Sequence, residues 1–184
     1  VEAQTAFHHA VDLWENLISS SVPIKIQANW SSLGSGVLGS AIYWSAFANF
    51  DGAQKLNVFY PIALAEKMAG KELNEPEDFE IFANFSSNID LYFGTSGSPA
   101  ANQFDFVTVV LHEIGHGLGF SGSFGVENNQ GIVGTFSTDI PIVYDALVEN
   151  SSGTKLLTFN APSSQLRSQL TSQNLRITVQ KNAV

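Results

Sequence analysis

Two histidines and a glutamate lie within five residues of one another, at positions 112–116. His112 and His116 are four positions apart, and Glu113 directly follows the first of them. On an α-helix, residues i and i+4 project from the same face, so both imidazoles can reach one metal ion. Glu113 projects in a different direction and can take a proton from a water molecule at that metal. The pattern predicts a zinc site with His112 and His116 as ligands and Glu113 as general base.

A helix over 104–118 must position these side chains. Its apolar residues recur at helical spacing and form a stripe that we expect to pack on a core, while His112 and His116 lie on the neighbouring stripe with Val109 and face a cleft. Asp105 is expected to cap the start of the helix, and Gly119 to end it in a left-handed conformation. The members of the apolar stripe are Val107, Val110, Leu111, Ile114 and Leu118.

The remaining pattern predicts an α+β fold. Apolar residues at helical spacing indicate a helix at 3–18, and alternation or apolar runs indicate strands at 24–29, 41–48, 56–60, 79–85 and 89–93. The strands 79–85 and 89–93 are expected to pair as a hairpin. Further helices are expected at 62–69, ended by Gly70, and at 143–149 and 163–171. We expect an N-terminal subdomain at 1–120, ending with the metal-binding helix, and the start of a C-terminal subdomain at 121–184.

The composition and charge of the chain disfavour several classes of function. The 184 residues carry 8 Lys and Arg against 17 Asp and Glu, for a net charge of −9, which disfavours binding to nucleic acid. With no cysteine, the sequence contains neither disulfides nor thiolate ligands. No apolar run is long enough to predict a membrane span. Composition leaves the oligomeric state open.

The segment 108–120, TVVLHEIGHGLGF, resembles the zinc helix of the metzincin-like metallopeptidases. Further segments are similar to a group of secreted bacterial metallopeptidases that carry HExxHGLGF, distantly leishmanolysin-like and pappalysin-like. These segments are 14–39 (WENLISSSVPIKIQANWSSLGSGVLG), 92–94 (YFG), 105–120 and 144–145 (YD). The resemblance implies a metzincin-like zincin domain with a mixed twisted sheet, an N-terminal backing helix and a zinc-binding helix. It also implies that substrate adds to an edge strand, for which 79–85 is the candidate.

The third zinc ligand departs from the compact metzincin pattern HExxHxxGxxH. Gly119 matches the glycine of that pattern, but the third ligand position falls on Gly122. No histidine follows His116, and the only methionine, Met68, precedes the helix. Because related enzymes place a third histidine far downstream, we expect this ligand beyond Val184, in which case the chain is a fragment of the catalytic unit. Within the chain, Asp145 is the best candidate.

The resulting expectation is a secreted zinc endopeptidase that binds Zn²⁺ and a protein or peptide substrate. A different class remains open: a non-catalytic binding or adhesion domain that retains a zincin scaffold. Since Glu113 is present, the sequence favours the enzyme.

Overall fold

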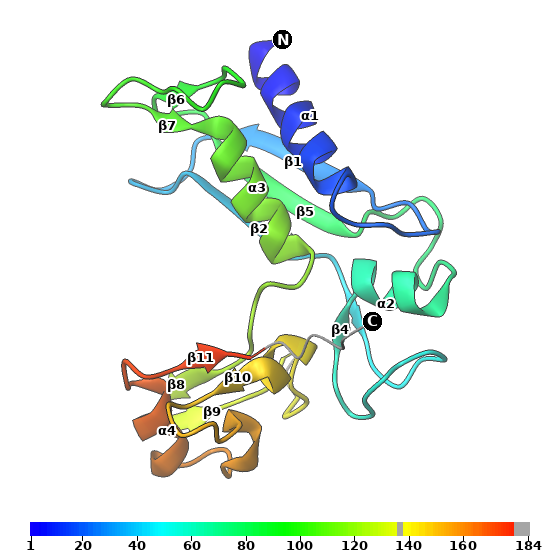
Figure 1. Ribbon diagram of the computed structural model, residues 1–184, viewed down its shortest axis with the longest axis vertical. Coiled ribbons are helices and arrows are strands. Elements are labelled where there is room, and N and C mark those ends of the chain that lie inside the picture. The colour runs from blue at the N-terminus through cyan, green and yellow to red at the C-terminus, as the bar shows by residue number, and fades with distance from the viewer. Residues whose placement is uncertain (136–137, 179–184) are drawn as a thin grey trace. The chain divides into compact units, whose positions relative to one another are not determined.

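The computed structural model describes residues 1–135 and 138–178 (Figure 1). The chain divides into two compact units, one of residues 1–46 and 61–118, the other of residues 47–60 and 119–184. The segment 47–60 therefore belongs with the C-terminal part of the chain, which the expected division at 120 does not include. Two short strands lie where the chain passes between the units, β3 (Ala46–Phe47) and β4 (Tyr60–Pro61).

The first unit is built on a mixed three-stranded sheet. Its central strand, β5 (Ile81–Ser86), pairs in parallel with β1 (Ile26–Ser31) and antiparallel with β2 (Gly39–Tyr43). Helices α1 (Glu2–Glu15) and α3 (Phe106–Gly117) cover one face of this sheet (Figure 1). The unit also contains α2 (Ile62–Ala69), β6 (Leu91–Tyr92) and β7 (Phe104–Asp105).

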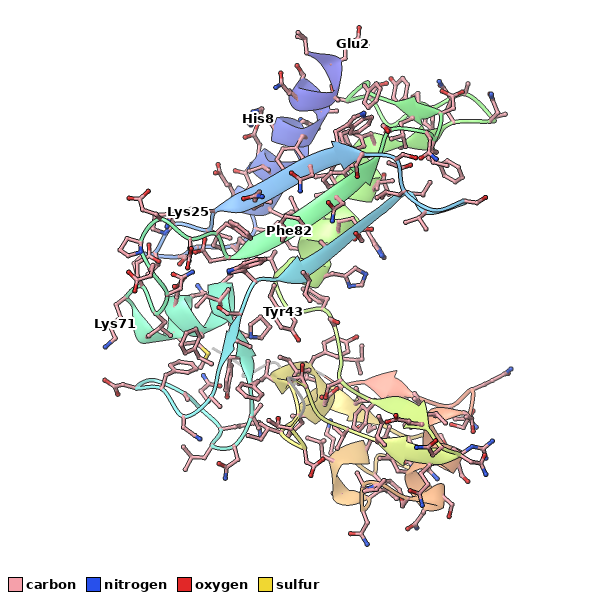
Figure 2. The ribbon with its side chains drawn as sticks, turned by 180° about the vertical axis from the view of Figure 1, so that it is seen from behind. Glu2, His8, Lys25, Tyr43, Lys71 and Phe82 are labelled. Atoms are coloured by element: carbon pink, nitrogen blue, oxygen red, sulfur yellow. The ribbon has the colours of Figure 1, made fainter. Side chains whose placement is uncertain are left out.

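The core of this unit lies between the two helices and the sheet. Ala6 and Ala10 of α1 are fully buried, and their small side chains let the helix lie close to its neighbours. Three aromatic rings, from Phe85, Phe106 and Phe93, pack edge to face with centroids 5.2–5.3 Å apart. Seen from behind, the sheet lies in front of the helices, and its strands carry Phe82 and Tyr43 (Figure 2).

Two expectations about β5 are wrong. β5 and β6 do not form a hairpin; β6 instead pairs in parallel with β7, with Leu91 opposite Phe104. Both edges of β5 are already hydrogen-bonded to β1 and β2, which leaves no edge for β6. For the same reason 79–85 does not supply an edge strand, because β5 is central and β1 and β2 are the edges of this sheet.

The second unit has its own small core of Val148, Leu156 and Leu166. A hairpin joins β8 (Gly125–Glu127) to β9 (Gln130–Ile132) through Asn128 and Asn129, both at positive φ, as a tight hairpin turn requires. The other elements of this unit are η1 (Val143–Leu147), β10 (Val148–Glu149), η2 (Leu156–Thr158), α4 (Ser164–Leu170) and β11 (Arg176–Ile177).

Candidate metal centre

Helix α3 begins at the expected cap. The Asp105 carboxylate accepts hydrogen bonds from the Thr108 backbone N–H at 2.9 Å and from the Thr108 hydroxyl at 2.6 Å. This cap satisfies one of the free N–H groups of the first turn. The end of the helix also agrees with the prediction, because Gly119 follows it with φ +112°.

The apolar stripe holds α3 against the sheet and α1. Val110 is 0% exposed and Ile114 is 2% exposed, while Leu111 and Leu118 pack on the same core with part of their surface outside. Val109, which the sequence placed beside the histidines, is also largely buried. The Trp14 indole N–H of α1 donates to the Leu111 carbonyl at 3.3 Å. These contacts fix the rotation of α3 about its axis, and with it the direction of His112 and His116.

The two histidines converge. Nε2 of His112 lies 2.9 Å from Nε2 of His116, and the rings stand perpendicular with centroids 4.5 Å apart. Two nitrogens bound to one tetrahedral Zn²⁺ at about 2.0–2.1 Å lie about 3.3 Å from each other. A small rotation of either ring therefore brings the pair to the spacing that zinc requires. His112 is exposed and His116 is half-buried, so an ion could reach both from solvent.

Glu113 turns away from the histidine pair and towards β2. Its side chain is 7% exposed, and its carboxylate accepts a hydrogen bond from the backbone N–H of Ala41. Burial raises the pKa of this carboxyl above its ordinary value, while the two neighbouring histidines and the Ala41 N–H act in the opposite direction. A carboxylate in this position is held in one place and accepts a proton more readily than an exposed one.

Gly39 makes room for this glutamate. A β-carbon at Gly39 would lie 3.0 Å from Glu113 Cγ and 3.2 Å from the Asn84 carbonyl oxygen. The sequence predicted neither Gly39 nor Ala41 as part of the site, because both come from β2, more than 70 positions before Glu113. No local motif marks them.

A cleft of about 520 Å³ opens beside His112 and Glu113. Its walls come from the chain before and within β2 and from the first turns of α3. They are formed by Gly36, Val37, Leu38, Gly39, Phe104, Asp105, Thr108, Val109, His112 and Glu113. The lining is mostly apolar, and its ionisable residues are Asp105, His112 and Glu113.

Asp145, the candidate third ligand within the chain, belongs to the second unit. It is fully buried, and its carboxylate accepts from the Ser123 N–H at 2.9 Å, the Ser123 hydroxyl at 2.5 Å and the Ile142 N–H at 3.0 Å. Burial raises its pKa, and these hydrogen bonds oppose the rise. A β-carbon at Gly122 would lie 2.8 Å from Asp145 Oδ1, so this carboxylate also explains the glycine there. Within its unit Asp145 orders the loop that follows Gly119.

In the described ranges, no helix has both the length and the apolar character needed to cross a membrane.

The sequence model of the SPBPB7E8-like family matches residues 5–161. An uncharacterized protein of Schizosaccharomyces pombe, PB7E8.01, is 36% identical over 76 residues. That alignment covers 40% of this chain and 13% of the yeast protein, so the chain spans a small part of its relative's length. No solved structure matches the chain. Because the family model covers most of the sequence, the chain belongs to the SPBPB7E8-like family.

Proposed function

We propose that the chain is part of a secreted, zinc-dependent endopeptidase with a metzincin-like α+β fold. One observation carries the proposal: the Nε2 atoms of His112 and His116 converge to 2.9 Å while the intervening Glu113 is buried beside an open cleft. A solvated helix face that carried two histidines by chance would not need a glutamate held in place by a neighbouring strand.

His112 and His116 would hold the ion through their Nε2 atoms. When bound, zinc polarises a carbonyl group and makes a water molecule more acidic. Glu113 accepts the proton of the attacking water and passes it to the leaving amine, so no covalent link to the enzyme forms.

Strand β2 is the natural edge for a peptide substrate. It is an edge of the three-stranded sheet, and its Gly39 and Ala41 touch the general base. An extended peptide that adds to β2 places its backbone beside Glu113, and the apolar part of the cleft can take a side chain. This assignment replaces the expected edge at 79–85.

Within the first unit, His112 and His116 supply two imidazole ligands to the proposed zinc site. Catalytic zinc sites commonly use three protein ligands and one water molecule, so two imidazoles alone would bind the ion weakly.

The rival class is a binding or adhesion domain that kept a zincin scaffold without its chemistry. The test is cleavage of an unfolded protein by the full-length protein, with and without a chelator. We expect cleavage that stops on chelation, returns with zinc, and falls roughly 10²–10⁴-fold in Glu113→Gln while zinc remains bound. Zinc binding with no cleavage would favour the rival, and more than a tenth of the activity in Glu113→Gln would remove Glu113 from its role.

A further inference from the structure

A second group of ionisable side chains lies in the first unit, apart from the histidine pair. It consists of Glu66 in α2, Glu72 in the following loop and Glu80 just before β5, here called the acidic cluster. One carboxylate oxygen from each glutamate lies within 4.8 Å of the others. Glu66 is 1% exposed and Glu80 is fully buried. Three carboxylates this close, in a poorly hydrated place, repel one another strongly.

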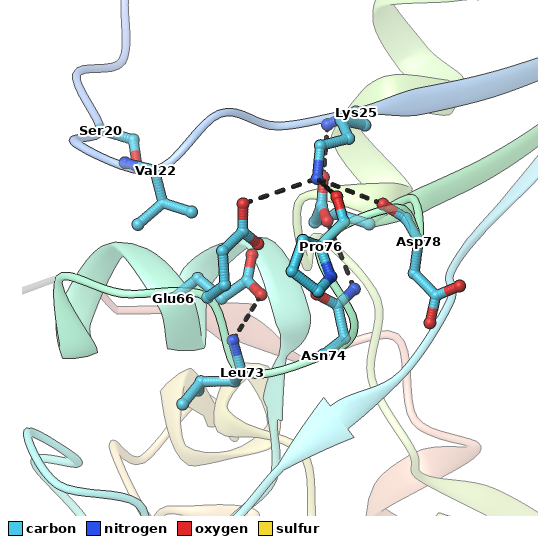
Figure 3. A network of polar contacts seen from close by, with 10 residues as sticks. Ser20, Val22, Lys25, Glu66, Leu73, Asn74, Pro76 and Asp78 are labelled. Atoms are coloured by element: carbon cyan, nitrogen blue, oxygen red, sulfur yellow. Dashed lines mark hydrogen bonds and ion pairs between the residues drawn. The ribbon is translucent and has the colours of Figure 1, made fainter.

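Lys25 brings a positive charge to this group. Nζ of Lys25 lies 3.5 Å from Glu72 Oε1 and donates to the carbonyl oxygens of Pro76 and Asp78 at 2.7 and 3.4 Å (Figure 3). The Lys25 backbone N–H donates to Glu80. Lys25 can balance one of the three negative charges, which leaves two without a positive partner among these contacts.

Several oxygens in the cluster also lack a hydrogen-bond donor. Glu66 Oε1 accepts from the Leu73 N–H at 2.9 Å, and the Asn74 N–H also approaches this carboxylate, while Glu66 Oε2 is buried and makes no hydrogen bond of ordinary geometry (Figure 3). The same is true of Glu72 Oε2 and of Asn74 Oδ1. Asn74 belongs to the group because its amide nitrogen lies 3.4 Å from Glu80 Oε1. A buried acceptor without a donor costs about 1–3 kcal/mol, and more when it is charged, so a cation that bound these oxygens would recover this cost.

We propose that the acidic cluster, together with the Asn74 amide oxygen, binds one calcium ion. The donors are all oxygens, which suits a hard cation, and no imidazole or thiolate is present to favour zinc. Ca²⁺ binds oxygens at about 2.3–2.6 Å, so oxygens across its shell lie up to about 5 Å apart, in keeping with the spacing of the cluster. Mg²⁺ requires shorter and more regular contacts.

The ion would fasten the loop 70–80 to the start of the sheet. Glu66 comes from α2, while Glu72 and Asn74 come from the loop and Glu80 precedes the central strand. Because the site joins three consecutive segments, its ion adds to the stability of the first unit. This inference does not depend on the proposed peptidase activity.

The test uses the full chain with His112 and His116 both changed to Ala, so that the zinc centre cannot contribute. Equilibrium dialysis against Ca²⁺ alone should give about one ion per chain at millimolar Ca²⁺. Glu66→Gln should weaken this binding at least about tenfold. Glu77→Gln, which removes the same charge from an exposed position in the same loop, is the matched control and should leave the binding unchanged.

Thermal unfolding separates ion binding from a merely structural role. In a chelator, Glu66→Gln should unfold no earlier than the parent, because Gln keeps the acceptor for the Leu73 N–H and removes a repelling charge. Millimolar Ca²⁺ should raise the midpoint of the parent by about 5 °C and leave Glu66→Gln unmoved. Equal Ca²⁺ binding by Glu66→Gln and Glu77→Gln would overturn the proposal. So would the absence of binding at millimolar Ca²⁺, or tighter binding of Mg²⁺ than of Ca²⁺.

Discussion

Gly39 and Glu113 are in direct contact across the boundary between β2 and α3. The α-carbon of Gly39 faces the side chain of the glutamate so closely that a β-carbon there would lie 3.0 Å from Glu113 Cγ. The neighbouring Ala41 N–H then holds the carboxylate. The position of the proposed base is therefore set by a strand distant from it in the sequence.

Gly39→Ala tests this contact. The added methyl group must push the Glu113 side chain by a few tenths of an ångström, and small displacements of a catalytic group lower rates sharply. If the proposed peptidase activity is present in the full-length protein, we expect its kcat to fall about tenfold or more, with KM little changed and zinc content intact. Ser40→Ala, on the adjacent position of β2, is the control. Wild-type kcat in Gly39→Ala would show that Glu113 tolerates the shift.

The two glycines of α3 that flank His116 should respond in opposite directions to alanine. A β-carbon at Gly117 would lie 2.3 Å from Ile81 Cγ2, whereas at Gly115 the nearest atom, on Trp14, is 3.7 Å away. Gly117→Ala should lower the free energy of unfolding by about 1–3 kcal/mol through overpacking. Gly115→Ala should be neutral or raise it by up to about 1 kcal/mol, because alanine is the better helix former. Urea unfolding measures both, and a destabilised Gly115→Ala would mean that α3 packs more tightly against α1 than these distances indicate.

Each residue of the apolar stripe of α3 should contribute to the stability of the fold in proportion to how much of its side chain is buried. Ile114→Ala removes a side chain that is 2% exposed and should cost about 2–5 kcal/mol in the free energy of unfolding. Leu111→Ala should cost less, because part of that side chain lies outside the core. Urea unfolding measures these losses. A loss of less than about 0.5 kcal/mol in Ile114→Ala would mean that the rotation of α3 described above is wrong.

The raised pKa of Glu66 predicts how the stability of the protein depends on pH. Burial, followed by the nearby charges of Glu80 and Glu72, raises this pKa, and the Leu73 N–H opposes the rise. A group whose pKa is higher in the folded state stabilises the fold at low pH, and this contribution is lost as the pH rises through the folded value. In a chelator, the parent should therefore lose stability relative to Glu66→Gln as the pH rises above about 4.5, the ordinary value.

The comparison with Glu66→Gln is essential here because Glu113 and Asp145 also have raised pKa values and shift the parent in the same direction. Chemical denaturation at a series of pH values measures the difference between the two proteins. A difference that stays constant from acid to neutral pH would contradict the account of Glu66.

Local signals predicted α2 and α3 closely. Pro61 before α2, Gly70 after it at φ +68°, and the Asp105 cap of α3 all act within one or two turns, so sequence alone reveals them. The turn of Asn128 and Asn129 also has a local signal, since asparagine tolerates positive φ. The strands that pair with β5 could not be predicted from the sequence, because β1 and β2 lie about 40 to 55 positions away along the chain. One clue was present: 81–85 (IFANF) is more apolar than either neighbour, as a central strand requires.

The acidic cluster was missed for a related reason. Glu66, Glu72 and Glu80 follow no metal-binding spacing, and they meet only because the loop between α2 and β5 folds back on Lys25. By contrast, His112, Glu113 and His116 lie on one helix, where spacing alone determines direction.

The central claim is that His112 and His116 bind zinc, and zinc affinity of the chain tests it most directly. The measurement is equilibrium dialysis against Zn²⁺ in a zinc-buffered solution, with metal determined by mass spectrometry, for the parent, His112→Ala, His116→Ala and Glu113→Gln. We predict that each histidine substitution lowers the affinity at least about tenfold, and that Glu113→Gln retains the affinity of the parent. Equal zinc binding by the parent and by both histidine variants would contradict the account.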